Sequence, residues 1–530
     1  MCIRDRWYTD IIQEAQLADY SPVKGTMVIR PYGYALWENI QSYLDKRFKD
    51  TGHQNAYFPL FIPKSFIEKE AEHVEGFSPE LAMVTHAGGK ELEEPLVVRP
   101  TSETIINHMF AKWIKSHRDL PMLINQWANV VRWEMRTRLF LRTSEFLWQE
   151  GHTAHATESE ATEEALRMLE IYSEFAENAA AVSVVKGIKS ANERFAGATR
   201  TYSIEAMMKD MKALQAGTSH ELGQNFSKAF EIQFSDEENN LQHPYQTSWG
   251  VSTRLIGMII MAHGDDKGLN LPPKLAPHQV VIIPITPNED SKGSVLDATN
   301  KISEELGKSF RVYVDDRDNI SPGFKFNEWE LKGVPLRIEI GPRDVENKTV
   351  VFSRRDGVNG KFNINFDDVG TKVSETLDNI HNNLLESSKN FRKENTVHVD
   401  SYEDLISALN GDPGFVTCFW DENSDDEDKV KAETKATLRC YVLDEEKIIQ
   451  KISPYKDVDG LNNENLGLLA SGDPRFVPAT PLGVQRMINE IGIKTEGLKI
   501  VIIGRSKLVG IPLALLLSSK SDQGLSLIHI

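Results

Sequence analysis

Cysteine is scarce in this sequence, and its scarcity excludes two kinds of stabilising framework. The 530 residues contain only Cys2, Cys418 and Cys440. Three scattered cysteines cannot build a disulfide framework or a four-cysteine zinc site. We therefore predict no structural zinc, no other metal centre, and a reducing compartment, the cytoplasm.

Long apolar runs are missing as well, which argues against a membrane protein. The sequence has no stretch of about 18 apolar residues, the length that a membrane-spanning helix needs. Its apolar segment at 499–517 is interrupted by Arg505, Lys507, two glycines and a proline. The opening residues MCIRDRWYTD lack the apolar centre of a secretory signal. We also expect the first six residues to be foreign, because they match nothing around them.

Basic residues are in the minority. The chain has 60 lysines and arginines against 78 acidic residues, which gives a net charge of −18. Phosphate contacts dominate affinity for nucleic acids, so an RNA partner would have to meet a local basic face. The length predicts about three to four domains of roughly 150 residues each.

Hydrophobic periodicity predicts a chain of alternating helices and strands. A proline-rich linker, LNLPPKLAPH at 269–278, separates a first part from a small α/β domain that begins with the buried strand VVIIPI. We interpret the acidic run DENSDDEDK at 421–429 as a solvated loop. The expected helices cover residues 8–22, 33–51, 155–185, 254–263, 294–307, 324–333 and 367–395.

The stretch VVRPTSETIINH at 97–108 supports two interpretations. Thr101 and Glu103 could point a hydroxyl and a carboxylate into one pocket from a strand-to-helix turn. Alternatively, Thr101 or Ser102 caps the helix, and Glu103 or Thr104 occupies its first turn. Taken alone, the sequence favours the cap.

Four arginines crowd the short segment that follows: Arg132, Arg136, Arg138 and Arg142. Arginine makes bidentate contacts to phosphate and carboxylate groups, so arginines at both ends of a strand–loop–strand suit a triphosphate. The aromatic ring of Phe146 could stack on a purine base. The plainer alternative is a basic surface hairpin.

Trp148, Glu150 and His152 alternate along the next expected strand, so they share one face of it. An aromatic ring, a carboxylate and an imidazole together suit an amine, although they could also form a satisfied polar core. Further along, Arg254 opens an apolar helix. Burying an arginine there is costly unless its charge meets an anion.

Together these motifs resemble those of the class II aminoacyl-tRNA synthetases. RWE, the pair Arg142 and Phe146, and GVSTR resemble motifs 2 and 3, and NAYFPLFIP with Pro59 resembles motif 1, which serves a dimer interface. Over about 7–443 the chain is similar to the prolyl-tRNA synthetases, on the strength of RPTSET, FLWQEGHTAH, GTSHELGQNFSKAF and WELKGVPLRIEIGPRD.

The resemblance implies an α/β (α+β) fold and an activity. The enzyme would activate proline with ATP and Mg²⁺ to prolyl-adenylate and transfer it to the 3′ end of tRNA(Pro), as a homodimer away from membranes. The implied parts are a class II antiparallel sheet flanked by helices at 7–270, a mixed-sheet anticodon-binding domain at 277–375, and a truncated α/β unit at 376–443.

The resemblance also implies roles for individual residues. Proline would be bound by Thr101, Glu103, Arg132, Trp148, Glu150, His152 and His220. ATP would be bound by Arg132, Glu134, Arg142, Thr143, Phe146, Gln215, Thr218, Ser252 and Arg254, of which Arg132, Arg142 and Arg254 would be catalytic. Glu330, Arg337 and Arg343 would read the anticodon; alone, each could equally be a surface salt-bridge partner.

The segment between WQEGH at 148–152 and TSWGVSTR at 247–254 is too short for the large editing insertion of the bacterial-type enzymes. The chain therefore resembles the archaeal/eukaryotic-like type, and we expect it not to hydrolyse alanyl-tRNA.

From about 445 the sequence changes. KDVDGLN, FVPATPLGVQRMI and GRSKLVG resemble methylenetetrahydrofolate dehydrogenase/cyclohydrolase over about 445–520, within a partial Rossmann-like fragment at 444–522. This resemblance implies a folate contact at Asp459 and a phosphate-binding turn at Gly504, Arg505 and Ser506. The half that would carry the expected catalytic Tyr and Lys is not present, so we expect a poorly packed tail without dehydrogenase activity.

Three alternatives remain beside a proline–tRNA ligase. A non-catalytic tRNA-binding paralogue would be expected to lose the arginines that bind ATP, yet the sequence retains Arg132, Arg142 and Arg254. A bifunctional synthetase–dehydrogenase conflicts with the missing folate half. Specificity for threonine or histidine is disfavoured by FLWQEGH. We interpret the chain as pieces of two proteins joined near 443–447.

Overall fold

A computed structural model describes residues 3–73, 81–134, 136–411, 414–420, 423–443, 455, 457–493, 500, 502 and 509–518. The chain divides into two compact units, Met1–Val442 (unit 1) and Leu443–Ile530 (unit 2). The expected phosphate-binding turn at Gly504, Arg505 and Ser506 lies outside the described residues.

The first elements of unit 1 are two helices separated by a short hairpin. Helix α1 covers Ile3–Glu14, strands β1 (Ala18–Tyr20) and β2 (Met27–Ile29) pair antiparallel, and α2 covers Pro31–Asp50. The predicted helix over 8–22 is therefore wrong at its end. Gln16 has a φ of +60°, a left-handed conformation that stops a right-handed helix before the hairpin begins.

An eight-stranded sheet forms the centre of unit 1. Every neighbouring pair is antiparallel except β3 and β7, which run parallel. Such a sheet matches the predicted fold class. In sheet order its strands are β22 (Tyr441–Val442), β9 (Val184–Ile188), β10 (Arg200–Met207), β11 (Ala213–Gly223), β14 (Tyr245–Ser252), β8 (Glu145–His155), β7 (Met122–Val131) and β3 (Gln54–Asn55).

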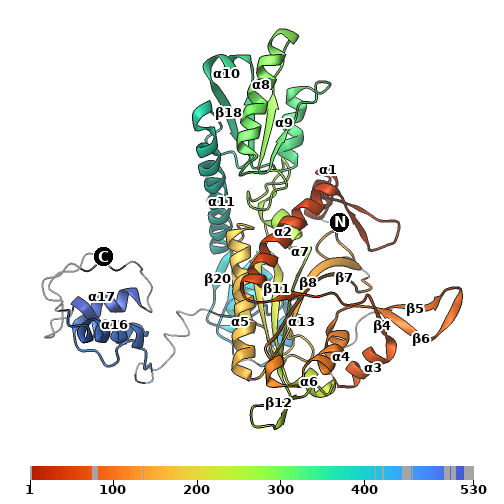
Figure 1. Cartoon of the computed structure of the whole chain (residues 1–530), viewed down its shortest axis with the longest axis vertical. Helices are drawn as coiled ribbons and strands as arrows, with labels where there is room; N and C mark the ends of the chain where they lie inside the picture. The colour runs from red at the N-terminus through yellow and green to blue at the C-terminus, as the bar shows by residue number, and fades with distance from the viewer. Residues whose placement is uncertain are drawn as a thin grey trace. The chain divides into compact units, whose positions relative to one another are not determined.

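Helices flank this sheet (Figure 1). The longest is α5 (Glu158–Asn178), which starts with a capping box: the Thr157 hydroxyl accepts from the Glu160 amide at 3.3 Å, and the Glu160 carboxylate accepts from the Thr157 amide at 3.1 Å. The acidic first turn, with Glu158 and Glu160, suits the positive end of the helix dipole. The shorter helices are α4 (Glu103–Trp113), α6 (Asn225–Ala229) and the apolar α7 (Arg254–His263).

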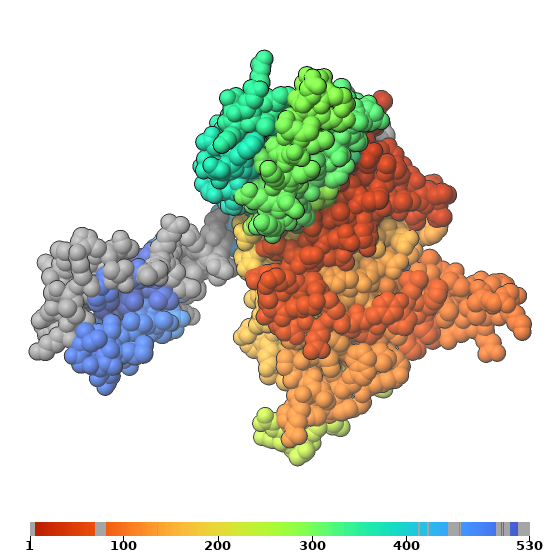
Figure 2. Space-filling model, turned by 45° about the horizontal axis from the view of Figure 1, so that its top comes forward, coloured from red at the N-terminus to blue at the C-terminus, as the bar shows by residue number. Residues whose placement is uncertain are grey.

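A second, three-stranded sheet projects from the body of unit 1 (Figures 1 and 2). Its order is β4 (Phe61–Pro63), β6 (Lys90–Val98) and β5 (Ala82–Ala87), and α3 (Lys64–His73) follows β4. The strand-like stretch NAYFPLFIP is divided between β3 and β4. The residues between the two strands are irregular, and the ring of Tyr57 is 78% exposed.

The α/β domain after the proline-rich segment has the predicted mixed sheet. Strands β16 (Val312–Val314), β15 (Val280–Pro284) and β17 (Leu336–Ile340) are parallel, and β18 (Thr349–Arg354) and β19 (Lys361–Asn365) continue antiparallel. Its helices are α8 (Glu289–Leu306), α9 (Pro322–Leu331), α10 (Pro342–Asn347) and α11 (Val369–Glu394). α11 runs from beside β18 toward β20 (Figure 1).

A small α/β element completes unit 1. Strands β20 (Thr396–His398) and β21 (Phe415–Thr417) pair parallel, beside α12 (Tyr402–Asn410) and α13 (Ser424–Thr434). The interpretation of the acidic run as a solvated loop is wrong, because α13 begins within it. Asn423 caps this helix by accepting from the Asp425 amide at 2.9 Å, and buried Glu427 accepts a hydrogen bond from the Ser190 hydroxyl.

Unit 2 contains α15 (Asn463–Ser471), α16 (Ala479–Glu490) and α17 (Gly510–Ser518). Leu513 and Leu517 form a small buried cluster. Asp459, the predicted folate contact, is exposed, whereas the neighbouring Asp457 is buried and accepts from the Asn462 amide at 2.7 Å. Of the helices in the described part of the chain, none has the length and apolar character needed to cross a membrane.

Candidate active site

A cavity of about 280 Å³ lies on the eight-stranded sheet of unit 1. Strands β8, β10, β11 and β14 supply most of its walls, and residues at the starts of α4 and α7, after β7 and between β9 and β10 complete them. It brings together residues that lie far apart in the sequence. Of the predicted site residues, the lining includes Thr101, Glu103, Arg132, Phe146, Trp148, Glu150, His152, Gln215, Thr218, His220, Ser252 and Arg254.

The turn before α4 faces the cavity rather than capping the helix. Ser102 occupies the N-cap position, but its side chain makes no cap hydrogen bond. Its hydroxyl instead donates to Oε1 of Glu150 at 2.5 Å, and the Thr101 hydroxyl donates to the Glu103 carboxylate. Ser102 and Glu103 hold the expected N-cap and first-turn positions, but the expected cap hydrogen bond is not formed, because the hydroxyls bind carboxylates at the cavity.

Glu150 and His152 form a buried charged pair at the end of the cavity that holds the carboxylates. His152 Nε2 lies 3.2 Å from Glu150 Oε2, and Gln126 donates to Glu150 Oε1 at 2.8 Å. Burial alone would raise the pKa of Glu150, but the hydrogen bonds from His152, Ser102 and Gln126 outweigh it and hold the pKa below its usual value. Burial likewise opposes protonation of His152, yet the bond to Glu150 and the nearby carboxylates raise its pKa.

His220 is the neutral counterpart of His152. Desolvation, followed by repulsion from His152, lowers the pKa of His220 to about 3. Its Nδ1 lies 3.0 Å from the Thr201 hydroxyl, and its ring lies against Phe195 with 4.6 Å between centroids. The carboxylate end of the cavity therefore holds one neutral imidazole and one that protonates readily.

Arginines occupy the other end. Arg132 donates from Nε to the Pro100 carbonyl at 3.0 Å, and its guanidinium lies 5.3 Å from the Trp148 ring centroid. Arg254 donates to the backbone carbonyl of Gln215 at 3.4 Å. Desolvation, followed by repulsion from Arg132 and Arg142, lowers the pKa of Arg254. Positive groups held together in this way create a site for an anion.

Three predicted ATP residues lie outside the cavity lining. Arg142 pairs with Glu134 at 2.7 Å, and the buried Thr143 donates its hydroxyl to a backbone carbonyl at 2.7 Å. Arg138, from the same arginine-rich segment, stacks on the ring of Tyr8 at 4.3 Å. Arg138 therefore ties the segment to α1, whereas Arg136 and Arg142 are exposed, as in the surface-hairpin interpretation.

Sequence reasoning missed several lining residues, among them Phe195, Thr201 and Trp249. Thr201 reaches the site because β10 pairs with β11 in a register that sets it opposite His220. Trp249 explains the glycine of WQEGH, because a Cβ at Gly151 would lie 2.1 Å from the Trp249 ring. That glycine could have indicated a close cross-strand packing partner.

The predicted anticodon residues lie in the α/β domain, in different settings. Glu330 accepts from Lys267 at 3.0 Å, and Arg337 donates to Glu339 at 3.0 Å and stacks on Phe326. Arg343 is exposed on α10. Glu330 and Arg337 thus do form the salt bridges of the plainer interpretation, and their anticodon role stays a prediction.

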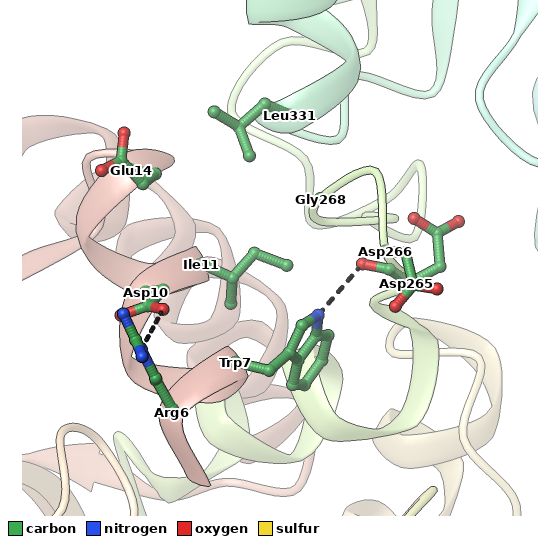
Figure 3. A pocket seen from close by; sticks show the side chains of 9 residues that line it. All are labelled: Arg6, Trp7, Asp10, Ile11, Glu14, Asp265, Asp266, Gly268 and Leu331. Carbon is green, nitrogen blue, oxygen red and sulfur yellow. Dashed lines mark hydrogen bonds and ion pairs between the residues drawn. The ribbon is translucent and has the colours of Figure 1, made fainter. Parts of the chain in front are cut away.

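A second cavity of about 370 Å³ lies between α1 and the turn after α7 (Figure 3). Trp7 donates to the Asp265 carbonyl at 3.3 Å, and Arg6 pairs with Asp10 (Figure 3). The Asp265 carboxylate is already bound by both Nη atoms of Arg355. Among the described residues that line this cavity, none is a predicted site residue.

An antiparallel sheet that carries a cavity with a carboxylate end and an arginine end, followed by a mixed α/β domain, defines a class II aminoacyl-tRNA synthetase. The family described as tRNA synthetase class II core domain (G, H, P, S and T) matches residues 84–263. The family described as anticodon binding domain matches residues 279–376.

Similar proteins narrow the amino-acid specificity within this class to proline. A proline–tRNA ligase of Alkaliphilus oremlandii is 58% identical over 443 residues, 84% of this chain and 92% of the relative. A chloroplastic/mitochondrial proline–tRNA ligase of Arabidopsis thaliana is 60% identical over 445 residues, 83% of this chain and 82% of the relative. The chain belongs to the proline–tRNA ligase family, and specificity for threonine or histidine finds no support.

A solved structure agrees with this family assignment. Prolyl-tRNA synthetase from Cryptosporidium parvum, complexed with halofuginone and AMPPNP, is 44% identical with a TM-score of 0.79 and covers 83% of this chain and 92% of its own. In unit 2, the NAD(P)-binding domain of tetrahydrofolate dehydrogenase/cyclohydrolase matches residues 478–530. This match begins after KDVDGLN and runs past residue 522, where we expected the fragment to end.

Proposed function

We propose that the cavity of unit 1 activates proline with ATP and that the chain then charges tRNA(Pro). The observation that supports this best is the division of one cavity into a carboxylate end and an arginine end. The substrates divide in the same way, because proline brings a cationic imino group and ATP brings a polyanion. Opposite charges held in a partly desolvated cavity attract more strongly than they do in water.

At the carboxylate end, Glu103 and Glu150 face the imino nitrogen of proline, and Trp148 packs against its ring. His152 and His220 close the pocket with Thr101. Hydrogen bonds from Ser102 and Gln126 fix the Glu150 carboxylate, so little reorganisation is needed when proline binds.

At the arginine end, Arg132 bridges the proline carboxylate and the α-phosphate, and Arg254 holds the phosphates further out. Phe146 stacks on adenine, and Gln215, Thr218 and Ser252 supply polar contacts to ATP, which enters with Mg²⁺. Arg142, Thr143 and Glu134 belong to the loop beside the cavity. From this loop they would contact ATP.

The chemistry needs no covalent enzyme nucleophile. A proline carboxylate oxygen attacks the α-phosphorus in line, and the bond to pyrophosphate breaks. The terminal ribose hydroxyl of the tRNA then attacks the carbonyl carbon of prolyl-adenylate, and AMP leaves. Positive groups stabilise charge on the reacting phosphate, and positioning supplies the rest of the acceleration.

We further propose the limits 7–270 for the catalytic domain, 277–375 for the anticodon-binding domain, 376–443 for the small α/β unit and 444–522 for the folate-enzyme fragment. Glu330, Arg337 and Arg343 would contact anticodon guanines. The stretch around Pro59 would meet a second copy of the chain in a homodimer, and the enzyme would work in the cytoplasm.

The test is the Arg132→Ala variant, assayed by proline-dependent ATP–pyrophosphate exchange. We expect the exchange rate to fall by about 100-fold or more, because one group that stabilises transition-state charge is lost. The matched control is Arg136→Ala, which removes an exposed arginine from the same segment and should keep the wild-type rate. Wild-type exchange in a folded Arg132→Ala protein would contradict the assignment.

A further inference from the structure

The last residues of unit 1 dock on the edge of the catalytic sheet. β22 pairs antiparallel with β9, with Tyr441 opposite Ile188 and Val442 opposite Gly187. The fit is close, because a Cβ on Gly187 would lie 2.3 Å from the Cys440 Sγ. A segment more than two hundred residues later in the chain thus becomes part of the sheet that carries the active site.

A buried ionic network anchors this segment. The Glu205 side chain is 1% exposed and accepts from Lys189 Nζ at 2.8 Å and from the Ser203 hydroxyl at 2.9 Å. Arg439 donates to the other Glu205 oxygen from two nitrogens, at 2.8 and 3.1 Å. Lys189 also donates to the Arg439 carbonyl at 2.7 Å, which closes the network.

The network adjoins the arginine end of the cavity. Glu205 lies opposite Gln215 across β10 and β11, next to a register shift, and Arg254 donates to the carbonyl of that same Gln215. Electrostatics show the same proximity. Desolvation, Arg132 and Arg142 lower the pKa of Arg254 most; after them the charge of Arg439 lowers it further, and that of Glu205 raises it.

We propose that Arg439 is a positioning residue for ATP binding, which keeps the Glu205 carboxylate occupied so that Arg254 stays available to the phosphates. Without Arg439, one oxygen of Glu205 would lose both of its donors. Lys189 and Ser203 would still bind its other oxygen. A buried carboxylate oxygen without donors is costly, which favours a new cationic partner for it. Arg254 is the nearby arginine that would pair with this Glu205 oxygen. Its guanidinium would then turn away from ATP.

This inference rests on the proposed role of Arg254, and it competes with a simpler one in which Arg439 only clamps the segment to the sheet. The two roles predict different changes in stability and in the KM values. A clamp affects stability and both substrates alike. A positioning residue affects the KM for ATP, spares the KM for proline, and depends on the charge of the side chain.

The experiment compares Arg439→Gln, which removes the charge at similar size, with Arg439→Lys, which keeps it, in the full chain. In ATP–pyrophosphate exchange we expect the glutamine variant to raise the KM for ATP about tenfold, the size of one charge-assisted contact, without a change in the KM for proline. The lysine variant should recover most of the loss, although it lacks the bidentate fork.

Arg392→Ala is the matched control, because Arg392 anchors α11 to the Val184 carbonyl of the same edge strand at 2.7 Å without touching Glu205. It should lower the melting temperature and leave the KM for ATP unchanged. Equal changes in both KM values for Arg439→Gln, an unchanged KM for ATP, or an unfolded protein would overturn the proposal. Arg254→Ala with a normal KM for ATP would instead contradict the proposed ATP site itself.

Discussion

Unit 1 and unit 2 both carry motifs that match known enzymes, but they differ in what those motifs are attached to. In unit 1, the motifs stand on an eight-stranded sheet backed by helices. In unit 2, the described helices bury few apolar side chains, chiefly the small cluster of Leu513 and Leu517, while Met487 of α16 and Ile491 just after it are 62% and 70% exposed. A motif becomes a site only where a packed core fixes its side chains.

The sharpest contrast between the units is chemical. We expect the purified chain to catalyse proline-dependent ATP–pyrophosphate exchange and to show no NADP-dependent oxidation of methylenetetrahydrofolate above the protein-free rate. The physical reason is that the described helices of unit 2 bury few apolar side chains, so they give the folate and the nucleotide little fixed surface. Spectrophotometric detection of NADPH in the same preparation is the measurement. Oxidation above background would mean that unit 2 contributes a working site.

The next contrast concerns the free energy of unfolding. All nine tryptophans lie in unit 1, so tryptophan fluorescence during urea denaturation reports that unit alone. Ile282→Ala removes a fully buried side chain from β15 and should lower the unfolding free energy of unit 1 by about 2–5 kcal/mol. Leu517→Ala removes a side chain that is 1% exposed in unit 2 and should leave the fluorescence transition where it is.

Amide hydrogen exchange completes this test. The amides of α16 should exchange at a lower urea concentration than the fluorescence midpoint, because few apolar contacts hold that helix. A shift of the fluorescence midpoint by Leu517→Ala would show instead that the two units unfold as one.

The last prediction concerns the acid sensitivity of unit 1. Desolvation first of all lowers the pKa of His155 and His263 to about 4 and that of His220 to about 3, all from an ordinary value of 6.5. Below pH 6.5 the unfolded chain binds protons that the folded chain excludes. Stability therefore falls as pH drops from about 6.5 toward 4, by up to about 1.4 kcal/mol per pH unit for each histidine.

Urea denaturation at several pH values, followed by tryptophan fluorescence, measures this slope. His263→Gln should reduce this slope, because glutamine does not titrate. Glutamine can still donate to the Ala180 carbonyl, which His263 contacts at 2.9 Å. A slope that is unchanged in this variant would mean that His263 is not excluded from protonation in the folded protein.

Local patterns predicted much of the fold and part of the site. The alternation of Trp148, Glu150 and His152 indicated one strand face, and all three line the cavity. What failed were features that depend on distant pairing. Ser102 meets a carboxylate of β8 rather than its own helix, and the acidic run becomes a helix whose Glu427 is buried against Ser190. Cross-strand register, which brings Thr201 to His220, is not a local property.

The pairing of β22 with β9 has a consequence for the behaviour of the protein in solution. Unpaired edge strands present free amide and carbonyl groups on which another chain can add a strand, which is a common route to aggregation. The two residues of β22 occupy that edge, and they are themselves too short to offer a long new one. Ending the chain before Tyr441 would expose the edge of β9 to other molecules. We therefore expect the shortened protein to be less soluble.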